Sequence, residues 1–64
     1  MPQGTIKDFD ITTGAGTVVR DDLVELAFDT QAFLDSRLEE LRLGQRVRFR
    51  LDGERVTDLQ LVSL

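Results

Sequence analysis

Residues 45–51 alternate strictly between polar and apolar side chains. The apolar positions are Val47, Phe49 and Leu51, and the positively charged ones are Arg46, Arg48 and Arg50. A period of two is typical of a strand with one buried face. Asp52-Gly53 follows, and a second run of β-type residues begins at Arg55. An Asp-Gly pair between two such runs predicts a β-hairpin with a type I′ turn.

The rest of the chain predicts three more short strands. Residues 3–10 form the first, while residues 15–20 and 23–28 form a second hairpin that turns tightly at Asp21-Asp22. Five short strands with tight turns favour an all-β fold: a small five-stranded antiparallel OB-fold barrel, occupying residues 1–64 as a single domain. The residues predicted to face inward are Ile6, Val18, Val24, Leu26, Val47, Phe49, Leu51, Leu59 and Leu61.

The segment 30–44 has a different periodicity. Ser36 and Glu39 have the spacing of a helix capping box, and the leucines of the segment that recur at helical spacing are Leu34, Leu38 and Leu41. We therefore expect one or two helical turns in the loop between the third and fourth strands.

Four blocks of residues follow the order of a known family. They are Gly4, Thr5, Ile6, Lys7 and Phe9; Gly14, Gly16 and Val18; Val24, Leu26 and Phe28; and Leu41, Gly44, Gln45, Val47, Phe49, Gly53 and Arg55. Over about residues 3–62 this pattern resembles the cold-shock domain family, whose first blocks run Gly-Thr-Val-Lys-Trp-Phe-Asn, Lys-Gly-Phe-Gly-Phe-Ile and Val-Phe-Val-His-Phe. The resemblance implies an OB-fold barrel that binds single-stranded nucleic acid by stacking bases on exposed aromatic side chains.

The stacking side chains are missing from the positions that the resemblance assigns to them. Those positions hold Asp8, Ala15, Thr17, Glu25 and Ala27. Each base–aromatic stack contributes roughly 1–3 kcal/mol, so losing four or five of them implies an affinity lower by a factor of at least about a thousand. The carboxylates of Asp8 and Glu25 add repulsion toward phosphate.

Three nucleic-acid contacts that the resemblance implies are retained: Lys7, Phe9 and Phe28. Phe28 shares the parity of Val24 and Leu26, which favours a place in the core. Phe9 is either a core residue or partly exposed, and Lys7 is either a phosphate contact or one solvated charge among others.

The chain is acidic, with 8 basic and 12 acidic residues and a net charge of −4. The whole deficit lies in residues 1–32, which hold two basic and six acidic side chains, whereas residues 33–64 hold six of each. Proteins that bind single strands use a positive groove along the phosphates. This charge distribution therefore argues against strong binding of nucleic acid.

Arg46, Arg48 and Arg50, which we refer to as the arginine patch, are the one local concentration of positive charge. Alternate residues of a strand are about 7 Å apart, so the three guanidinium groups share one face. The patch is either a docking face for an acidic partner or a phosphate backbone, or a solvated outer face whose arginines pair with neighbouring carboxylates.

Composition argues against an enzyme. The chain has no His, Cys, Tyr or Trp, which removes most nucleophiles and acid–base pairs and any Cys-based zinc site. Its acidic residues lack the spacing of an EF-hand, so we interpret them as a solvated face, with no metal and no cofactor. No apolar run reaches the roughly 20 residues of a membrane span and no secretory leader is visible, so we expect a cytoplasmic protein.

The sequence therefore favours a small acidic, non-enzymatic binding module. It would act through contacts with a protein partner or through self-association, with weak or absent binding of single-stranded nucleic acid. The alternative is a divergent DNA- or RNA-binding cold-shock protein, an RNA chaperone or a regulator of transcription or translation. That alternative would use Lys7, Phe9, Phe28 and the arginine patch.

Overall fold

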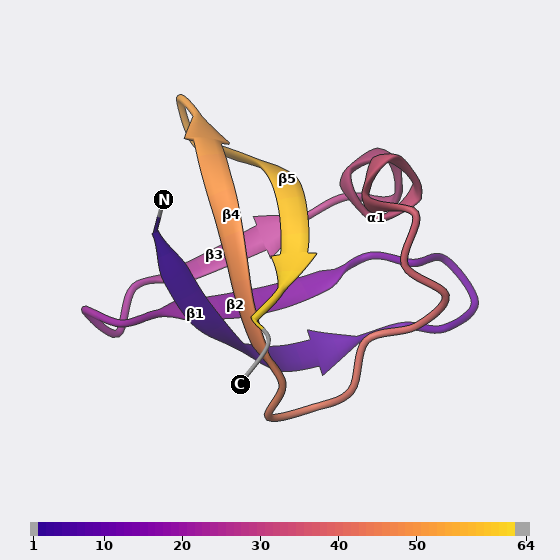
Figure 1. The fold of residues 1–64 in the computed structure, drawn as a ribbon, viewed down its shortest axis with the longest axis horizontal. Coiled ribbons are helices and arrows are strands. Elements are labelled where there is room, and N and C mark those ends of the chain that lie inside the picture. The colour runs from indigo at the N-terminus through magenta and orange to yellow at the C-terminus, as the bar shows by residue number, and fades with distance from the viewer. Residues whose placement is uncertain (1, 63–64) are drawn as a thin grey trace.

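The computed structural model describes residues 2–62 as five strands and one helix (Figure 1). In chain order they are β1 (Gln3–Phe9), β2 (Gly16–Arg20), β3 (Glu25–Phe28), α1 (Thr30–Ser36), β4 (Arg46–Asp52) and β5 (Arg55–Leu61). All pairings are antiparallel, and the strand order in the sheet is β3-β2-β1-β4-β5. The predicted five-stranded antiparallel sheet, with a short helix between the third and fourth strands, is confirmed.

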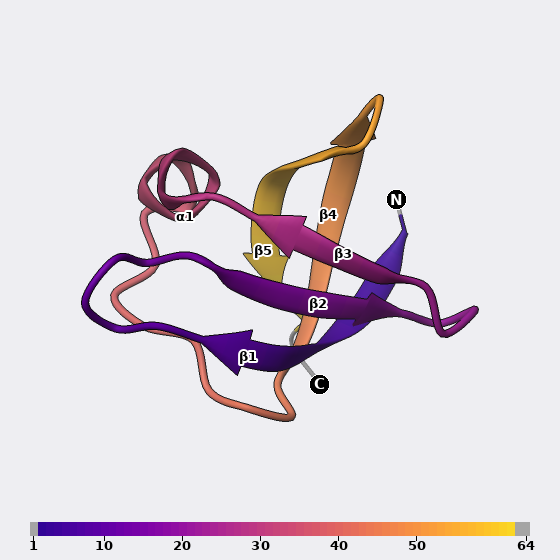
Figure 2. The same ribbon diagram turned by 180° about the vertical axis from the view of Figure 1, so that it is seen from behind.

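Strand β1 lies at the centre of the sheet. It pairs with β2 from Gly4 to Phe9 and with β4 through its first three residues. Figures 1 and 2 show that β4 and β5 run at a steep angle to β1, β2 and β3, so that the sheet curls around an interior. Within residues 2–62 no strand pairing joins β3 to β5, so the pairing does not close the sheet into the predicted barrel.

Apolar side chains from every element fill the interior of the curled sheet. The buried residues are Ile6, Val18, Phe28, Ala32, Leu41, Val47, Phe49, Val56 and Leu59. In β4 the burial follows the predicted alternation, because Val47 and Phe49 are fully buried while the arginines are exposed. Leu26 and Leu51, also predicted to face inward, are half-buried against this core.

Two residues that were predicted to face inward are exposed. Val24 is 43% exposed because it belongs to the β2–β3 turn and not to β3. Leu61 is 40% exposed at the end of β5, an edge strand. The predicted core is therefore wrong at these two positions.

A β-bulge in β5 explains why the sequence analysis missed Val56. The register between β4 and β5 shifts by one residue around Asp58, whose φ of 52° lies in the left-handed region. An extra residue of this kind reverses the alternation of inward and outward side chains. Val56 and Leu59 therefore both face the core, although they are three residues apart.

The turn between β2 and β3 is longer than the two residues predicted for it. The Leu23 amide donates to the Arg20 carbonyl at 2.8 Å, and the Arg20 amide donates to the Val24 carbonyl at 2.9 Å. Leu23 has a φ of 70°. A three-residue hairpin turn needs a residue in the left-handed region at this place, which favours glycine. Leucine in that position gave no turn signal, so the third strand starts later than predicted.

The turn between β4 and β5 consists of Gly53 and Glu54, since Asp52 pairs with Arg55. Gly53 has a φ of 63°, whereas the φ of Glu54 is not positive. A type I′ turn needs a positive φ at both central residues, and a type II′ turn needs it only at the first. The predicted hairpin is confirmed, but the predicted type I′ turn centred on Asp52-Gly53 is wrong.

Helix α1 lies in the predicted segment but starts earlier than its predicted cap. Asp29 is the N-cap, and its carboxylate accepts a hydrogen bond from the Ala32 amide at 2.8 Å. Arg37, with a φ of 61°, ends the helix. Ser36 is the last helical residue, and its hydroxyl donates to the Phe33 carbonyl. The capping box predicted at Ser36 is wrong because a carboxylate directly after β3 caps the first turn instead.

Leu23→Gly should stabilise the protein. A non-glycine residue in the left-handed region costs roughly 1–2 kcal/mol, and glycine removes this strain while adding some entropy to the unfolded chain, so we expect a net gain of up to about 1 kcal/mol. Little burial is lost because Leu23 is 82% exposed. The measurement is the free energy of unfolding in urea.

Leu43→Gly is the matched control, because Leu43 is also exposed but has no positive φ. It should leave the stability unchanged or lower it. A Leu23→Gly variant that is less stable than the parent would show that the leucine side chain makes a contact that outweighs the strain.

Candidate binding face on the first three strands

Three of the predicted stacking positions form one row across β1, β2 and β3. Asp8 pairs with Thr17, and Thr17 pairs with Ala27. Directly paired residues of a sheet point to the same face, with their Cβ atoms about 4.5–5.5 Å apart. This row faces away from the core, because Val18 and its partner Leu26, one position along each strand, face inward. We refer to Asp8, Thr17 and Ala27 as the outer row.

A bulge in β1 places Lys7 beside the outer row. The register with β2 shifts between Ile6 and Asp8, so Lys7 is an extra residue and its side chain is exposed. Its ammonium forms an ion pair with the carboxylate of Glu25 on β3. This hydrogen bond raises the pKa of Lys7 above its ordinary value. Lys7, predicted as a residual phosphate contact, is therefore engaged by a side chain that occupies one of the lost stacking positions.

A shallow hollow of about 650 Å³ adjoins the outer row. Its lining includes Asp8, Asp10, Ile11, Ala15, Thr17 and Leu43. Leu43 reaches the hollow because the Gly44 amide donates to the Ile6 carbonyl at 2.8 Å, which attaches the loop before β4 to the side of β1. Three of the five predicted stacking positions thus share one concave surface.

Sequence reasoning missed the apolar part of this surface. Ile11 and Leu43 are 75% and 68% exposed, and they come from two loops that are far apart in the chain. Neither residue belongs to a strand, so the alternation of side chains gave no signal for them. Ile11 and Leu43 line the same hollow because the loop before β4 is hydrogen-bonded to β1.

Gly14 and Gly16 allow the backbone to pack closely against neighbouring residues. A Cβ at Gly16 would collide with the carbonyl oxygen of Asp8 and would lie 2.7 Å from the ring of Phe28. Gly14 has a φ of 79°, and a Cβ there would lie 2.7 Å from the ring of Phe33. The glycine block of the sequence is therefore required by packing.

The four phenylalanine rings of the chain lie in or against the core, not on the outer row. Phe28 is 3% exposed and Phe49 is fully buried. Phe9 and Phe33 are half-buried and contact each other, with their ring centroids 5.0 Å apart. Phe28, predicted as a residual nucleic-acid contact, is therefore unavailable for stacking on a base. Phe9, the last residue of β1, packs against Phe33 of α1 and also lines the hollow.

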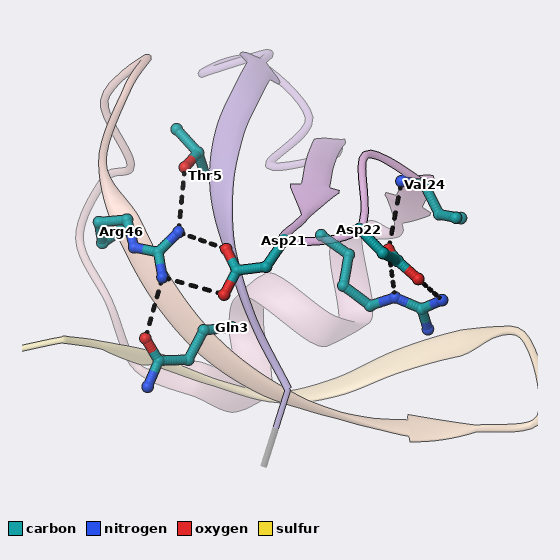
Figure 3. Close-up of polar contacts among 7 residues, drawn as sticks. Gln3, Thr5, Asp21, Asp22, Val24 and Arg46 are labelled. Atoms are coloured by element: carbon teal, nitrogen blue, oxygen red, sulfur yellow. Dashed lines mark hydrogen bonds and ion pairs between the residues drawn. The ribbon is translucent and has the colours of Figure 1, made fainter.

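Arg46 of the arginine patch is held by three neighbouring side chains (Figure 3). Its guanidinium donates to both carboxylate oxygens of Asp21, at 2.7 and 3.3 Å, and to the Oε1 atom of Gln3 at 3.0 Å. The Thr5 hydroxyl accepts a longer bond of 3.5 Å. The hydrogen bond from Arg46 lowers the pKa of Asp21. Arg46 therefore joins β4 to β1 and to the β2–β3 turn.

Arg48 and Arg50 make weaker contacts on the same face of β4. Arg48 donates to the Oε1 atom of Gln60 at 3.4 Å, and the Nε atom of Arg50 lies 3.6 Å from a carboxylate oxygen of Asp58. The arginine patch thus points outward, as the alternation predicted, and two of its members have carboxylate partners. Exposed pairs of this kind contribute little to stability.

A second arginine–carboxylate pair, in the β2–β3 turn, was not predicted. Arg20 donates to the two carboxylate oxygens of Asp22 at 2.8 and 2.6 Å, and the Val24 amide donates to the same carboxylate at 3.3 Å (Figure 3). The hydrogen bond from Arg20 is the main reason why the pKa of Asp22 is lowered to about 2.

This face offers carboxylates and apolar side chains to a ligand. Across residues 2–62, no group of three or more Asp and Glu side chains comes together as metal ligands, and no helix is long and apolar enough to cross a membrane. The hollow combines the carboxylates of Asp8 and Asp10 with the apolar side chains of Ile11 and Leu43. These groups can form ion pairs, hydrogen bonds and apolar contacts with a ligand.

The Asp22 carboxyl should titrate at about pH 2 in the folded protein, below its ordinary value of 3.8. Because the folded pKa is the lower one, the stabilisation from this pair is complete above pH 3.8 and is lost as the pH falls through about 2. Arg20→Gln should raise the pKa of Asp22 toward 3.8. The measurement is a titration of the carboxyl carbons by NMR.

Arg55→Gln is the control for this titration, since Arg55 lies 3.7 Å from Asp29 and not near Asp22. It should leave the pKa of Asp22 unchanged. If Asp22 titrates near 3.8 in the parent protein, its pair with Arg20 does not form in solution.

No family model matches this chain, and no curated protein has a matching sequence. The resemblance to the cold-shock domain family thus stays a prediction from the four sequence blocks. The arrangement of the outer row, the hollow and the arginine patch is the basis on which a function can be proposed.

Proposed function

We propose that this chain is a non-enzymatic binding module that contacts another protein and that binds single-stranded nucleic acid weakly or not at all. The observation that carries the proposal is the outer row. Asp8, Thr17 and Ala27 occupy paired positions on three strands, and all four phenylalanine rings of the chain lie in or against the core. A base that stacks on an aromatic ring gains roughly 1–3 kcal/mol. The outer row has no ring, and the ring that lines the adjoining hollow, Phe9, is half-buried and packs against Phe33.

The proposal includes the fold of the module, a cold-shock type of OB-fold. An OB-fold is a five-stranded barrel that is partly open. The strand order β3-β2-β1-β4-β5 and the curl that brings β3 close to β5 support this assignment. The packing of Gly14 and Gly16 gives a physical reason for the glycine block that carries part of the resemblance.

The charge of the face supports the same proposal. Binding of a phosphate backbone depends on lysines and arginines that are free to neutralise it. Lys7 is paired with Glu25 and Arg46 with Asp21, while Asp8 places a carboxylate in the outer row. A nucleic-acid strand that approaches this face therefore meets carboxylates before it meets an available cation.

Electrostatic binding of single strands by the arginine patch is the second candidate. Arg48 and Arg50 favour it, because both are exposed and their partners lie at 3.4 and 3.6 Å, contacts that a phosphate can displace. Such binding would depend steeply on salt and would not distinguish one base from another.

Labelled oligothymidine and unstructured RNA should bind with a Kd no tighter than roughly 10 μM at physiological salt. The fluorophore belongs on the nucleic acid, since the chain has no Trp or Tyr. Fluorescence anisotropy at low and moderate salt is the measurement. Sub-micromolar binding would contradict the proposal.

The double variant Arg48→Glu/Arg50→Glu identifies the source of any weak binding that remains. It leaves Arg46 in place, because that residue clamps three parts of the structure together. Loss of the residual binding would assign it to the arginine patch, as the second candidate requires.

Replacing the missing aromatic side chains should restore binding of single strands. The variant carries Asp8→Trp, Ala15→Phe, Thr17→Phe, Glu25→Phe and Ala27→His. Because three of these positions are directly paired on adjacent strands, the new rings would form a continuous surface, and we expect the affinity for oligothymidine to rise at least about a hundredfold. The same anisotropy assay measures the gain.

Asp52→Phe/Arg55→Phe is the matched control, since these two residues are also directly paired and exposed but lie outside the arginine patch. It tests whether any pair of exposed rings on this sheet binds bases. A restored variant that folds but binds no better than the control would mean that the first three strands do not carry a cold-shock type of binding face.

A further inference from the structure

We infer that the hollow beside the outer row binds a basic and partly apolar peptide segment of a partner protein. A lysine or arginine of that segment would pair with Asp8 and Asp10, and an adjacent apolar side chain would contact Ile11 and Leu43. This inference rests on the proposed function, which it deepens by naming the surface and the chemistry of the partner.

The carboxylates of Asp8 and Asp10 are available to a ligand cation. Neither has an ion-pair partner among residues 2–62. The neighbouring cation, Lys7, is already hydrogen-bonded to Glu25. Asp10 accepts a hydrogen bond from the Thr12 amide at 2.9 Å, which orients its carboxylate within the β1–β2 loop. The hollow therefore presents two negative charges that the described part of the chain does not neutralise.

The half-buried ring of Phe9 lines part of the hollow, and the exposed apolar component is the pair Ile11 and Leu43. Both are largely exposed, and both line the same hollow. Large apolar side chains that gather at the surface and are bordered by polar groups mark interaction sites. The volume of about 650 Å³ falls within the roughly 300–1,000 Å³ of ordinary ligand pockets, while its shallow shape suits the side chains of a peptide better than an enclosed small molecule.

Charge complementarity selects a basic peptide over the other occupants. A nucleic acid would bring phosphates against Asp8 and Asp10, which costs binding free energy. A second copy of this chain would have to supply free cations, but most of its basic side chains have carboxylate partners in the described residues: Lys7, Arg20, Arg42, Arg46, Arg50 and Arg55. A partner segment with unpaired lysines or arginines can pair with Asp8 and Asp10 without first breaking ion pairs of its own.

The test uses the full chain and a fluorescein-labelled peptide of twelve alternating lysine and leucine residues. Two matched peptides replace every lysine by glutamate or every leucine by serine. Fluorescence anisotropy measures the affinity, and ¹H–¹⁵N NMR spectra of the protein locate the site. We expect the Lys/Leu peptide to bind and to shift the amides of residues 8–11 and 43. The Glu/Leu peptide should not bind, and the Lys/Ser peptide should bind more weakly.

Two double variants test the two components of the hollow separately. Asp8→Asn/Asp10→Asn keeps the shape and the acceptor for Thr12 but removes the charge, and Ile11→Ser/Leu43→Ser removes the apolar contact. Each should weaken binding of the Lys/Leu peptide about fivefold to thirtyfold. The matched controls change exposed residues outside the hollow and should have no effect; they are Asp52→Asn/Glu54→Gln and Leu34→Ser. Circular dichroism checks that every variant is folded.

The outcomes separate this inference from the proposed function. No binding of the Lys/Leu peptide, or equal binding by the parent and both double variants, would overturn the inference, while the oligonucleotide assay would still decide the proposed function. Displacement of the peptide by oligothymidine at sub-micromolar concentration would overturn both. Dimerisation of the protein alone that Ile11→Ser/Leu43→Ser abolishes would assign the hollow to a second copy and would also overturn the inference.

Discussion

Strand β1 is shared by both halves of the curled sheet, and the other elements depend on this pairing. Its first three residues pair with β4, and residues Gly4 to Phe9 pair with β2 on the other side. The backbone of Ile6 also holds the loop before β4, since its amide donates to the Gln45 carbonyl at 2.9 Å and its carbonyl accepts from Gly44. The bulge at Lys7 belongs to the same strand, and a bulge bends a strand and increases its twist. The bulge in this central strand thus leaves both Lys7 and Asp8 exposed on the outside of the sheet.

The regular parts of the fold were predictable from the sequence, and the irregular parts were not. Alternation located β4 and its buried face correctly, because a strand with one solvent-exposed and one buried face must alternate polar and apolar side chains. The errors arise where one residue changes the local geometry without a composition signal. Asp58 shifts the register of β5, Leu23 occupies a left-handed turn position, and Asp29 caps the helix from outside the predicted segment.

The sequence likewise predicted one part of the candidate site and not the other. The outward positions on β1, β2 and β3 were named from the sequence blocks, and the structure places three of them in one row. The hollow was not predictable, because it brings Ile11 to Leu43 through the long-range pairing of the loop before β4 with β1. The residues of the sequence blocks also differ in how strongly packing constrains them. The glycines are fixed by close packing against Asp8, Phe28 and Phe33, whereas outward side chains can change without disturbing the core. The glycine block therefore bears on the fold, and the outward residues bear on the binding that we propose.

The open edges of the sheet have a consequence for the behaviour of the protein at high concentration. An exposed edge strand is a template on which strands of other molecules can add, and natural sheets limit this with short edges, charged residues and bulges. Here β3 is only four residues long and begins with the charged Glu25, while β5 is interrupted by the bulge at Asp58. Both edges are therefore poor templates for aggregation. A small protein with such edges can keep apolar side chains such as Ile11 and Leu43 exposed on its surface without extending its sheet from one molecule to the next.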